Sequence, residues 1–143
     1  MTNYKSKNAK RVLVVDDSTV TRKVIAAILN ADPDLQVIGE AADGLEGVRL
    51  AAELRPDVIT MDLNMPNMNG DEATRRIMAA MPTPIVVVTS ISREDQIHGG
   101  LDILLEGALE IVQKPGSLSE KAYKVISDEL VSKVKAVAQV ILR

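Results

Sequence analysis

Five polar side chains follow or close short apolar runs, and their types could do chemistry together: Asp16, Asp17, Asp62, Thr89 and Lys114. If those runs are parallel strands, their carboxyl ends meet at one edge of a sheet, which is where such sheets bind ligands. Three neighbouring carboxylates cannot all stay ionised unless a cation lies among them, because like charges raise one another's pKa. A donor set of oxygens alone favours Mg²⁺, Mn²⁺ or Ca²⁺ over zinc.

A cation beside one ammonium and one hydroxyl suits a phosphoryl group, because phosphoryl transfer needs positioning and charge neutralisation more than covalent machinery. Asp62 is the expected acceptor, since it ends a central run and precedes the rigid loop 63–66. Taken alone, the pair Asp16–Asp17 could be helix caps, and Thr89 or Lys114 could be an ordinary strand or surface residue. The functional interpretation of each residue depends on the others.

Runs rich in aliphatic and β-branched residues indicate the elements that must position this set. Five of them are predicted as strands: 12–15, 36–41, 58–61, 85–88 and 111–112. Four are nearly continuous, as in strands buried on both faces of a parallel sheet, and the second, less pure one is expected at an edge. Segments of helical period lie between and after them, and capping-box spacings occur at Asp43/Glu46, Asn69/Glu72 and Ser117/Glu120. The fourth helical segment, 97–108, is expected to stop near Gly107. A β-α unit repeated five times predicts an open, doubly wound parallel sheet.

The last helical segment is longer than the others. Its apolar stripe runs from Leu118 through Val134 and Val137 to Ile141, about twice the mean length of a helix in a globular domain. Beyond about Val131 the stripe exceeds what a fifth helix needs. It is therefore expected to pack on something other than this domain, either as a linker element or as a contact between the last helices of a homodimer.

Composition narrows the classes of protein that the chain can be. Its 143 residues suit one domain, and a net charge of −3 without a dense basic run argues against nucleic-acid binding. The absence of cysteine excludes disulfides, zinc-thiolate sites and thiol nucleophiles. The polar, lysine-rich N-terminus does not resemble a signal peptide, and no window reaches the length of a membrane span. We expect a cytoplasmic domain with an aliphatic core and with neither nucleic acid nor membrane as a partner.

Four strings in the chain resemble the receiver domain of two-component response regulators: VLVVDDS, DVITMDLNMPNMNG, PIVVVTS and IVQKP. They occur in the order of that family and at compatible separations over residues 11–131. Each string alone is a weak signal, and the four together are a strong one. The resemblance implies a flavodoxin-like fold of the α/β class, with a five-stranded parallel doubly wound sheet and five helices, the last one extended.

The resemblance also implies how a phosphoryl group is accepted and reported. Asp62 would take it from the phosphohistidine of a sensor histidine kinase, Lys114 would pair with its oxygens, and Thr89 would swing in to hydrogen-bond it. Many receivers carry an aromatic residue three positions before the lysine, which rotates inward on activation. Ile111 stands there in this chain, so the switch is expected to run through Thr89, a labile fourth helix and repacking of β-branched residues.

A cation site follows from the same resemblance. Asp17 and Asp62 would bind Mg²⁺, or Mn²⁺ in its place, directly and together with the backbone carbonyl of Asn64. Asp16 would act mainly through water.

Further strings resemble one subfamily, the regulatory half of the chemotaxis protein-glutamate methylesterase: GDEATRRIMAAMPTPIVVVTS, the pair Thr89–Ser90, and LVSKVKAVA. In that subfamily a linker joins the receiver to a hydrolase domain, which this chain does not contain. The chain is therefore expected to be either an isolated receiver or the N-terminal regulatory fragment of a methylesterase. Beyond its own phosphorylation and dephosphorylation, we expect no separate enzyme activity from it.

Two other classes of protein share part of this site. A phosphatase of the haloacid dehalogenase type also uses a strand-end aspartate, a lysine and Mg²⁺, but it needs a further acid where this chain has Ser18. A flavodoxin-like FMN carrier needs a hydroxyl-rich phosphate loop and, usually, aromatic residues against the flavin. This chain offers one short SxVT stretch and no suitable aromatic residue.

The sequence thus predicts a response-regulator receiver that is phosphorylated on Asp62 and controls a partner or an output domain, in signalling of the chemotaxis type. We divide the chain into a flexible N-terminus (1–10), the receiver domain (11–131) and a C-terminal helical extension or linker (132–143). The expected partners are a sensor histidine kinase, an output domain or partner protein, and a second copy of the chain.

Overall fold

The computed structural model describes residues 4–90, 107–114 and 120–142. Its elements, in chain order, are β1 (Lys10–Val15), α1 (Thr19–Asn30), β2 (Leu35–Ala41), α2 (Gly44–Leu54), β3 (Val58–Met61), α3 (Gly70–Ala80), β4 (Ile85–Thr89), β5 (Glu110–Gln113) and α6 (Glu120–Val137). The helical segment expected over 97–108 lies mostly outside the described residues, as does the expected cap at Ser117. Gly107 is described, and its φ of +125° is a backbone conformation that glycine adopts at a helix end or turn.

The five strands form one parallel sheet in the order β2-β1-β3-β4-β5. Chain order reverses between β1 and β3, which makes the carboxyl ends of these two strands the expected ligand site of the sheet. β2 lies at an edge, as its mixed composition predicts. The α/β class and the doubly wound parallel sheet are confirmed, with four helices among the described residues.

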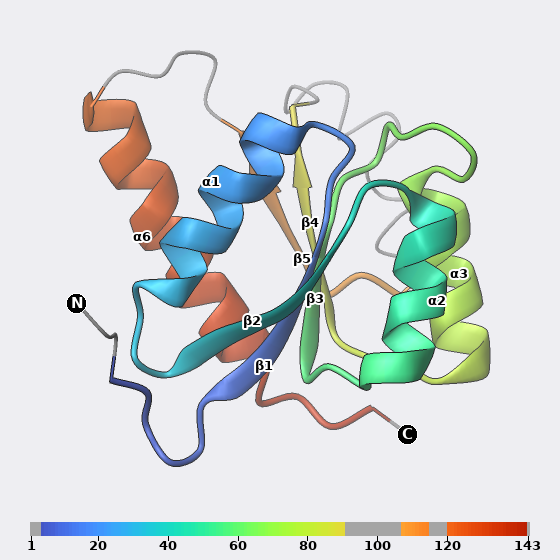
Figure 1. Ribbon diagram of the computed structural model, residues 1–143, viewed down its shortest axis with the longest axis horizontal. Coiled ribbons are helices and arrows are strands. Elements are labelled where there is room, and N and C mark those ends of the chain that lie inside the picture. The colour runs from blue at the N-terminus through green and yellow to red at the C-terminus, as the bar shows by residue number, and fades with distance from the viewer. Residues whose placement is uncertain (1–3, 91–106, 115–119, 143) are drawn as a thin grey trace.

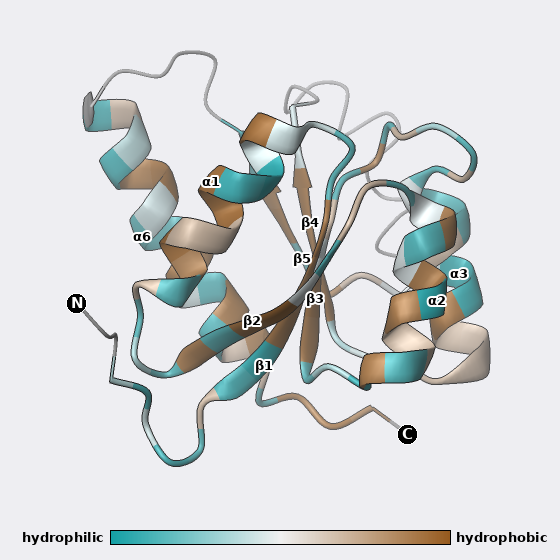
Figure 2. Cartoon of the chain, viewed as in Figure 1, coloured by the Kyte–Doolittle hydropathy of each residue, from teal (hydrophilic) through white to brown (hydrophobic). Residues whose placement is uncertain are grey.

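Helices α1 and α6 cover one face of the sheet, and α2 and α3 cover the other (Figure 1). Side chains alternate along β1, so Val12 and Val14 join the core beneath α1 and α6, while Leu13 and Val15 join the core on the opposite face. The central strands are therefore apolar on both faces (Figure 2). This double burial explains their nearly continuous apolar sequences and leaves the charged side chains at the strand ends.

Two of the expected helix caps are present. Asp43 Oδ1 accepts a hydrogen bond from Glu46 N at 2.8 Å, and Asn69 Oδ1 accepts one from Glu72 N at 2.9 Å. Each side chain thereby satisfies a backbone N–H that the first helical turn leaves without a helical partner. The starts of α2 and α3 are fixed in this way.

Helix α6 packs on the domain's own core. It ends at Val137 rather than running to the chain end, and Val134 and Val137 are 0% and 7% exposed among residues of α1 and the sheet. The expectation that the stripe beyond Val131 packs on something else is therefore wrong for these two residues. They continue the helical face that begins at Leu130 and buries against the sheet.

The N-terminal segment expected to be flexible makes backbone contacts to the turn between α1 and β2. Ser6 N donates to Pro33 O at 2.8 Å, and Lys5 Nζ donates to the carbonyls of Asn30 and Asp32. On the far side of the same turn, Lys135 of α6 pairs with Asp32 at 3.3 Å. The turn thus joins the start of β1 to the last helix.

Candidate functional site

Three carboxylates meet where β1 and β3 end. Val15 and Met61 are paired in the sheet, and Asp62 N donates to Val15 O at 3.0 Å, so Asp16 and Asp62 leave neighbouring strand ends. One carboxylate oxygen from each of Asp16, Asp17 and Asp62 lies within 4.8 Å of the others. The prediction that these three residues converge at the carboxyl edge of the sheet is borne out by this geometry.

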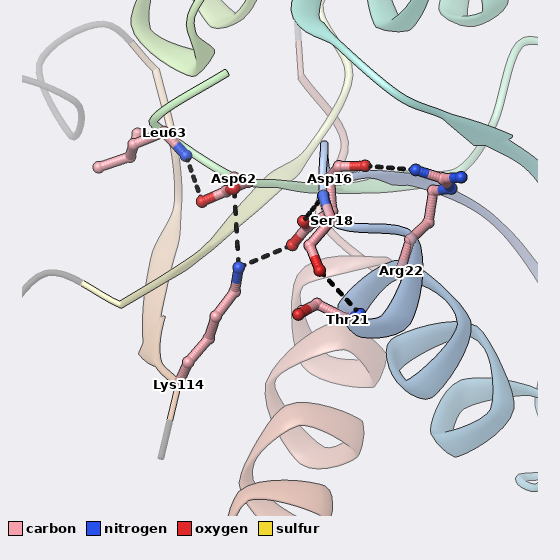
Figure 3. A network of polar contacts seen from close by, with 7 residues as sticks. All are labelled: Asp16, Ser18, Thr21, Arg22, Asp62, Leu63 and Lys114. Carbon is pink, nitrogen blue, oxygen red and sulfur yellow. Dashed lines mark hydrogen bonds and ion pairs between the residues drawn. The ribbon is translucent and has the colours of Figure 1, made fainter. Parts of the chain in front are cut away.

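Asp16 is buried, and both of its carboxylate oxygens have partners (Figure 3). Oδ1 accepts from Ser18 N at 2.9 Å, and Oδ2 accepts from Lys114 Nζ at 2.7 Å. The cap of α1 is Ser18, whose side chain accepts from Thr21 N at 3.2 Å. The carboxylates of the adjacent aspartates are therefore not needed to cap the helix.

Asp62 points toward the same ammonium group as Asp16. Its Oδ1 accepts from Leu63 N at 2.9 Å, and its Oδ2 lies 3.6 Å from Lys114 Nζ. Burial raises the pKa of Asp62 from its ordinary value of 3.8 to about 6; Lys114 acts against this rise and the negative charge of Asp16 adds to it. One lysine thus pairs with two of the three clustered carboxylates, and its single charge does not fully offset theirs.

Lys114 is brought to the site by the last strand pair. Thr89 and Gln113 are paired across β4 and β5, and Lys114 N donates to Thr89 O at 2.7 Å. Thr89 is 1% exposed at the end of β4. The backbone of Thr89, which is expected to sense the phosphoryl group, therefore holds the backbone of Lys114, which is expected to bind it.

The loop after Asp62 is fixed at both ends. Gly70 N donates to Leu63 O at 2.8 Å, and a Cβ atom on Gly70 would lie 2.1 Å from Asp62 O. Asn67, at φ 65°, donates from Nδ2 to Asp43 Oδ2 at 2.7 Å and joins the loop to the start of α2. Asn64 lies exposed within this loop.

Sequence reasoning missed Gly70 and Arg22 as parts of the site. Gly70 reads in the sequence as a helix entry, and its close approach to Asp62 O is visible only once the loop has folded. Arg22 is in α1, and its Nη1 donates to Asp16 O at 2.8 Å. Its position one turn into the helix after the two aspartates is the only sequence signal that could have singled it out.

The three carboxylates fit a hard divalent cation. They offer only oxygen donors, which Mg²⁺ and Mn²⁺ prefer, and their charge exceeds that of the single lysine. Burial is the main cause of the raised pKa of Asp62, and the negative charge of the buried Asp16 adds to it.

Comparison with known proteins gives the family. A model of the response regulator receiver domain matches residues 12–125, and the chain belongs to this family. The structure also resembles the response regulator domain of CheB from Thermotoga maritima, with a TM-score of 0.85 and 40% identity over 94% of this chain and 99% of that one. A LuxR-family response regulator from Aurantimonas sp. SI85-9A1 has a TM-score of 0.76 and 30% identity over 91% of this chain and 85% of that one.

Within the family, the curated relatives are of the CheB type. The protein-glutamate methylesterase/protein-glutamine glutaminase of Pyrococcus abyssi is 41% identical over 91% of this chain and 35% of its own length. A homologue from Myxococcus xanthus is 45% identical over 91% of this chain and 36% of its own length. This chain therefore spans about a third of the length of these relatives and matches their receiver portion. None of its described helices is long and apolar enough to cross a membrane.

Proposed function

We propose that Asp62 accepts a phosphoryl group from the phosphohistidine of a sensor histidine kinase. The observation that carries this proposal is the position of the Asp62 carboxylate, on a side chain that is 9% exposed, beside Lys114 and within 4.8 Å of two further carboxylates. Asp16, Asp17, Asp62 and the backbone carbonyl of Asn64 would hold the divalent cation, Mg²⁺ or Mn²⁺. When bound, the cation neutralises negative charge on the carboxylates and the phosphoryl oxygens.

The chain's own residues position the acceptor for this transfer. One oxygen of Asp62 bonds to phosphorus while the bond from phosphorus to the donor imidazole nitrogen breaks, and the imidazole leaves as a neutral ring after gaining a proton at its other nitrogen. Leu63 N–H holds Asp62 Oδ1 at 2.9 Å, which fixes the plane of the carboxylate. Lys114, 3.6 Å from Oδ2, supplies the positive charge that the incoming oxygens need.

The same contacts support a conformational output. Lys114 lies closer to Asp16, at 2.7 Å, than to Asp62, and a dianionic group on Asp62 would draw it away. Because Lys114 N is bonded to Thr89 O, that movement acts on the ends of β4 and β5 together. Ile111 is aliphatic, so we expect the motion to spread through Thr89 and the packing of β-branched residues rather than through a rotating ring.

The curated relatives support a place in chemotaxis-type signalling. Their names state a protein-glutamate methylesterase activity, and this chain matches about a third of their length. We therefore propose that the receiver works in the cytoplasm and controls an output domain or partner protein. The alternative is that the chain is the N-terminal regulatory part of such a methylesterase. Residues 11–131 would form the receiver, and a homodimer through the last helices would use the exposed part of α6.

Labelling with a small acyl phosphate tests this function. The unmodified protein with Mg²⁺ should gain the mass of one phosphoryl group, and Asp62→Asn should gain none, because its amide cannot attack phosphorus. Labelling of the variant to the same extent would refute the assignment of the acceptor. Continued release of product from a simple phosphate monoester, with no modified protein, would favour the phosphatase alternative.

A further inference from the structure

Arg22 joins the loop of the two aspartates to the edge strand. Its Nη1 donates to Asp16 O at 2.8 Å, and its Nε lies 3.3 Å from Glu40 Oε1 on β2. Figure 3 shows the Arg22 side chain rising from α1 and pointing its guanidinium group at Asp16. The side chains of Arg22 and Glu40 are only 14% and 27% exposed. Arginine's planar fork can hold two acceptors at once, whereas a lysine ammonium at this point would hold one of them well.

With Arg22 bonded to the carbonyl, every hydrogen-bonding group of Asp16 has a partner. The backbone N–H donates to Ala41 O at 3.0 Å, the carbonyl accepts from Arg22, and the carboxylate accepts from Ser18 N and Lys114 Nζ. The peptide that links Asp16 to Asp17 is planar, so the direction of the Asp16 carbonyl sets where the Asp17 Cα atom lies. Asp17 is exposed and belongs to the acidic cluster. Arg22 therefore acts on Asp17 through the backbone without touching its carboxylate.

Glu40 makes this arrangement compatible with a cation site. A lone guanidinium group beside three carboxylates would compete with a divalent cation for their negative charge. Glu40 lies against the guanidinium group and also within 3.1 Å of Lys23 Nζ, so its single negative charge offsets part of the positive charge of these two residues outside the cluster. What Arg22 contributes to the cluster is the orientation of one peptide plane.

We propose that Arg22, held by Glu40, is a positioning residue that sets the geometry of the divalent cation site through the Asp16–Asp17 peptide. This inference rests on the proposed function, because it concerns the cation that supports phosphorylation of Asp62. It adds two residues to the site that do not contact the phosphoryl group.

Titration of the full chain with Mn²⁺ tests the proposal without any phosphodonor. The signal of free Mn²⁺ in electron paramagnetic resonance gives the dissociation constant, and far-ultraviolet circular dichroism confirms the fold of each variant. Arg22→Met keeps the apolar stem of the side chain and should weaken Mn²⁺ binding on the order of tenfold or more, as is typical when a group that orients a ligand is removed. Arg22→Lys should restore part of that loss. Glu40→Gln should weaken binding by a smaller factor, and the double variant should bind no more weakly than Arg22→Met alone.

A matched control is available on α2. Arg49 forms an exposed ion pair with Glu53 at 3.1 Å, away from the acidic cluster, and Arg49→Met should leave the dissociation constant unchanged. Mn²⁺ binding by folded Arg22→Met that equals the binding by Arg49→Met would overturn the inference while leaving the proposed function intact. Should Arg22→Met fail to fold, Arg22→Lys and Glu40→Gln decide, and unchanged binding in both would reject the positioning role. Absence of Mn²⁺ binding by the unmodified protein would overturn the proposed cation site and this inference with it.

Discussion

The burial of Asp62 has a thermodynamic consequence that can be measured without any phosphodonor. A rise of its pKa from 3.8 to about 6 corresponds to about 3 kcal/mol at 1.36 kcal/mol per pKa unit. Because the native state holds this proton more tightly than the unfolded chain, it binds more protons between about pH 4 and pH 6. The contribution of Asp62 to the free energy of unfolding therefore falls as pH rises through that window and levels off above about pH 7.

Asp62→Asn removes the titrating group and keeps an oxygen that can accept from Leu63 N. In chelator-treated buffer the variant should be the more stable protein at pH 8, by at most about 3 kcal/mol. The more specific signature is the change with pH. The stability difference between the variant and the unmodified protein should widen by about 1.4 kcal/mol from pH 5 to pH 8, because Asp62 loses its proton over that range. Effects of the amide on packing are the same at both pH values and cancel in this comparison.

Urea denaturation followed by far-ultraviolet circular dichroism measures this difference, which suits a chain with two tyrosines and no tryptophan. The denaturant dependence should be equal for both proteins, so that the midpoints report stability. A variant whose stability difference stays constant between the two pH values would refute the reasoning, because Asp62 would then have an ordinary pKa in the folded state.

Three further substitutions, one of them with a matched control, test other parts of the structure. Lys114→Met should lower the free energy of unfolding in chelator-treated buffer at pH 8 by about 2 kcal/mol, because two buried carboxylates lose their partner. The loss should shrink at pH 5, where Asp62 is protonated. Equal losses in urea titrations at both pH values would argue against the ion pairs. Gly70→Ala should lower the free energy of unfolding by about 1–3 kcal/mol and slow acyl-phosphate labelling, since the new Cβ would lie 2.1 Å from Asp62 O. Unchanged stability and an unchanged labelling rate would show that the loop yields easily. Val134→Ala should lower the thermal midpoint and the free energy of unfolding, the latter by about 2 kcal/mol. Ile141 is 79% exposed, so Ile141→Ala should leave the free energy of unfolding unchanged within error. Similar losses for the two variants would contradict the packing of α6 on this core.

The strands and the acidic site were predictable for the same reason. Val12, Leu13, Val14 and Val15 are all buried because β1 is covered on both faces, and the charged residues next to this buried stretch lie at its two ends, at Arg11 and Asp16. Parallel pairing then brings the ends of β1, β3, β4 and β5 to one edge. The strand pattern alone therefore predicts that Asp16, Asp62 and Lys114, which are distant in the sequence, lie close together.

The end of the last helix was not predictable from its apolar stripe. Val134 and Ile141 fall on the same helical face in the sequence, yet Val134 is buried and Ile141 is 79% exposed. The helix ends at Val137, and periodicity carries no information on where along the stripe the helix stops. Arg22 was missed on similar grounds, because its partners are a backbone carbonyl and Glu40 on another strand.

The central claim is that Asp62 itself carries the phosphoryl group, and the most direct test is to locate the modification. Borohydride converts a phosphorylated aspartate to homoserine, so peptide mass spectrometry after reduction identifies the residue. We predict homoserine at position 62 in protein treated with acyl phosphate and Mg²⁺, and none there when the cation is removed by a chelator. Homoserine at position 16 or 17 instead, or equal conversion of Asp62 without the cation, would contradict the account.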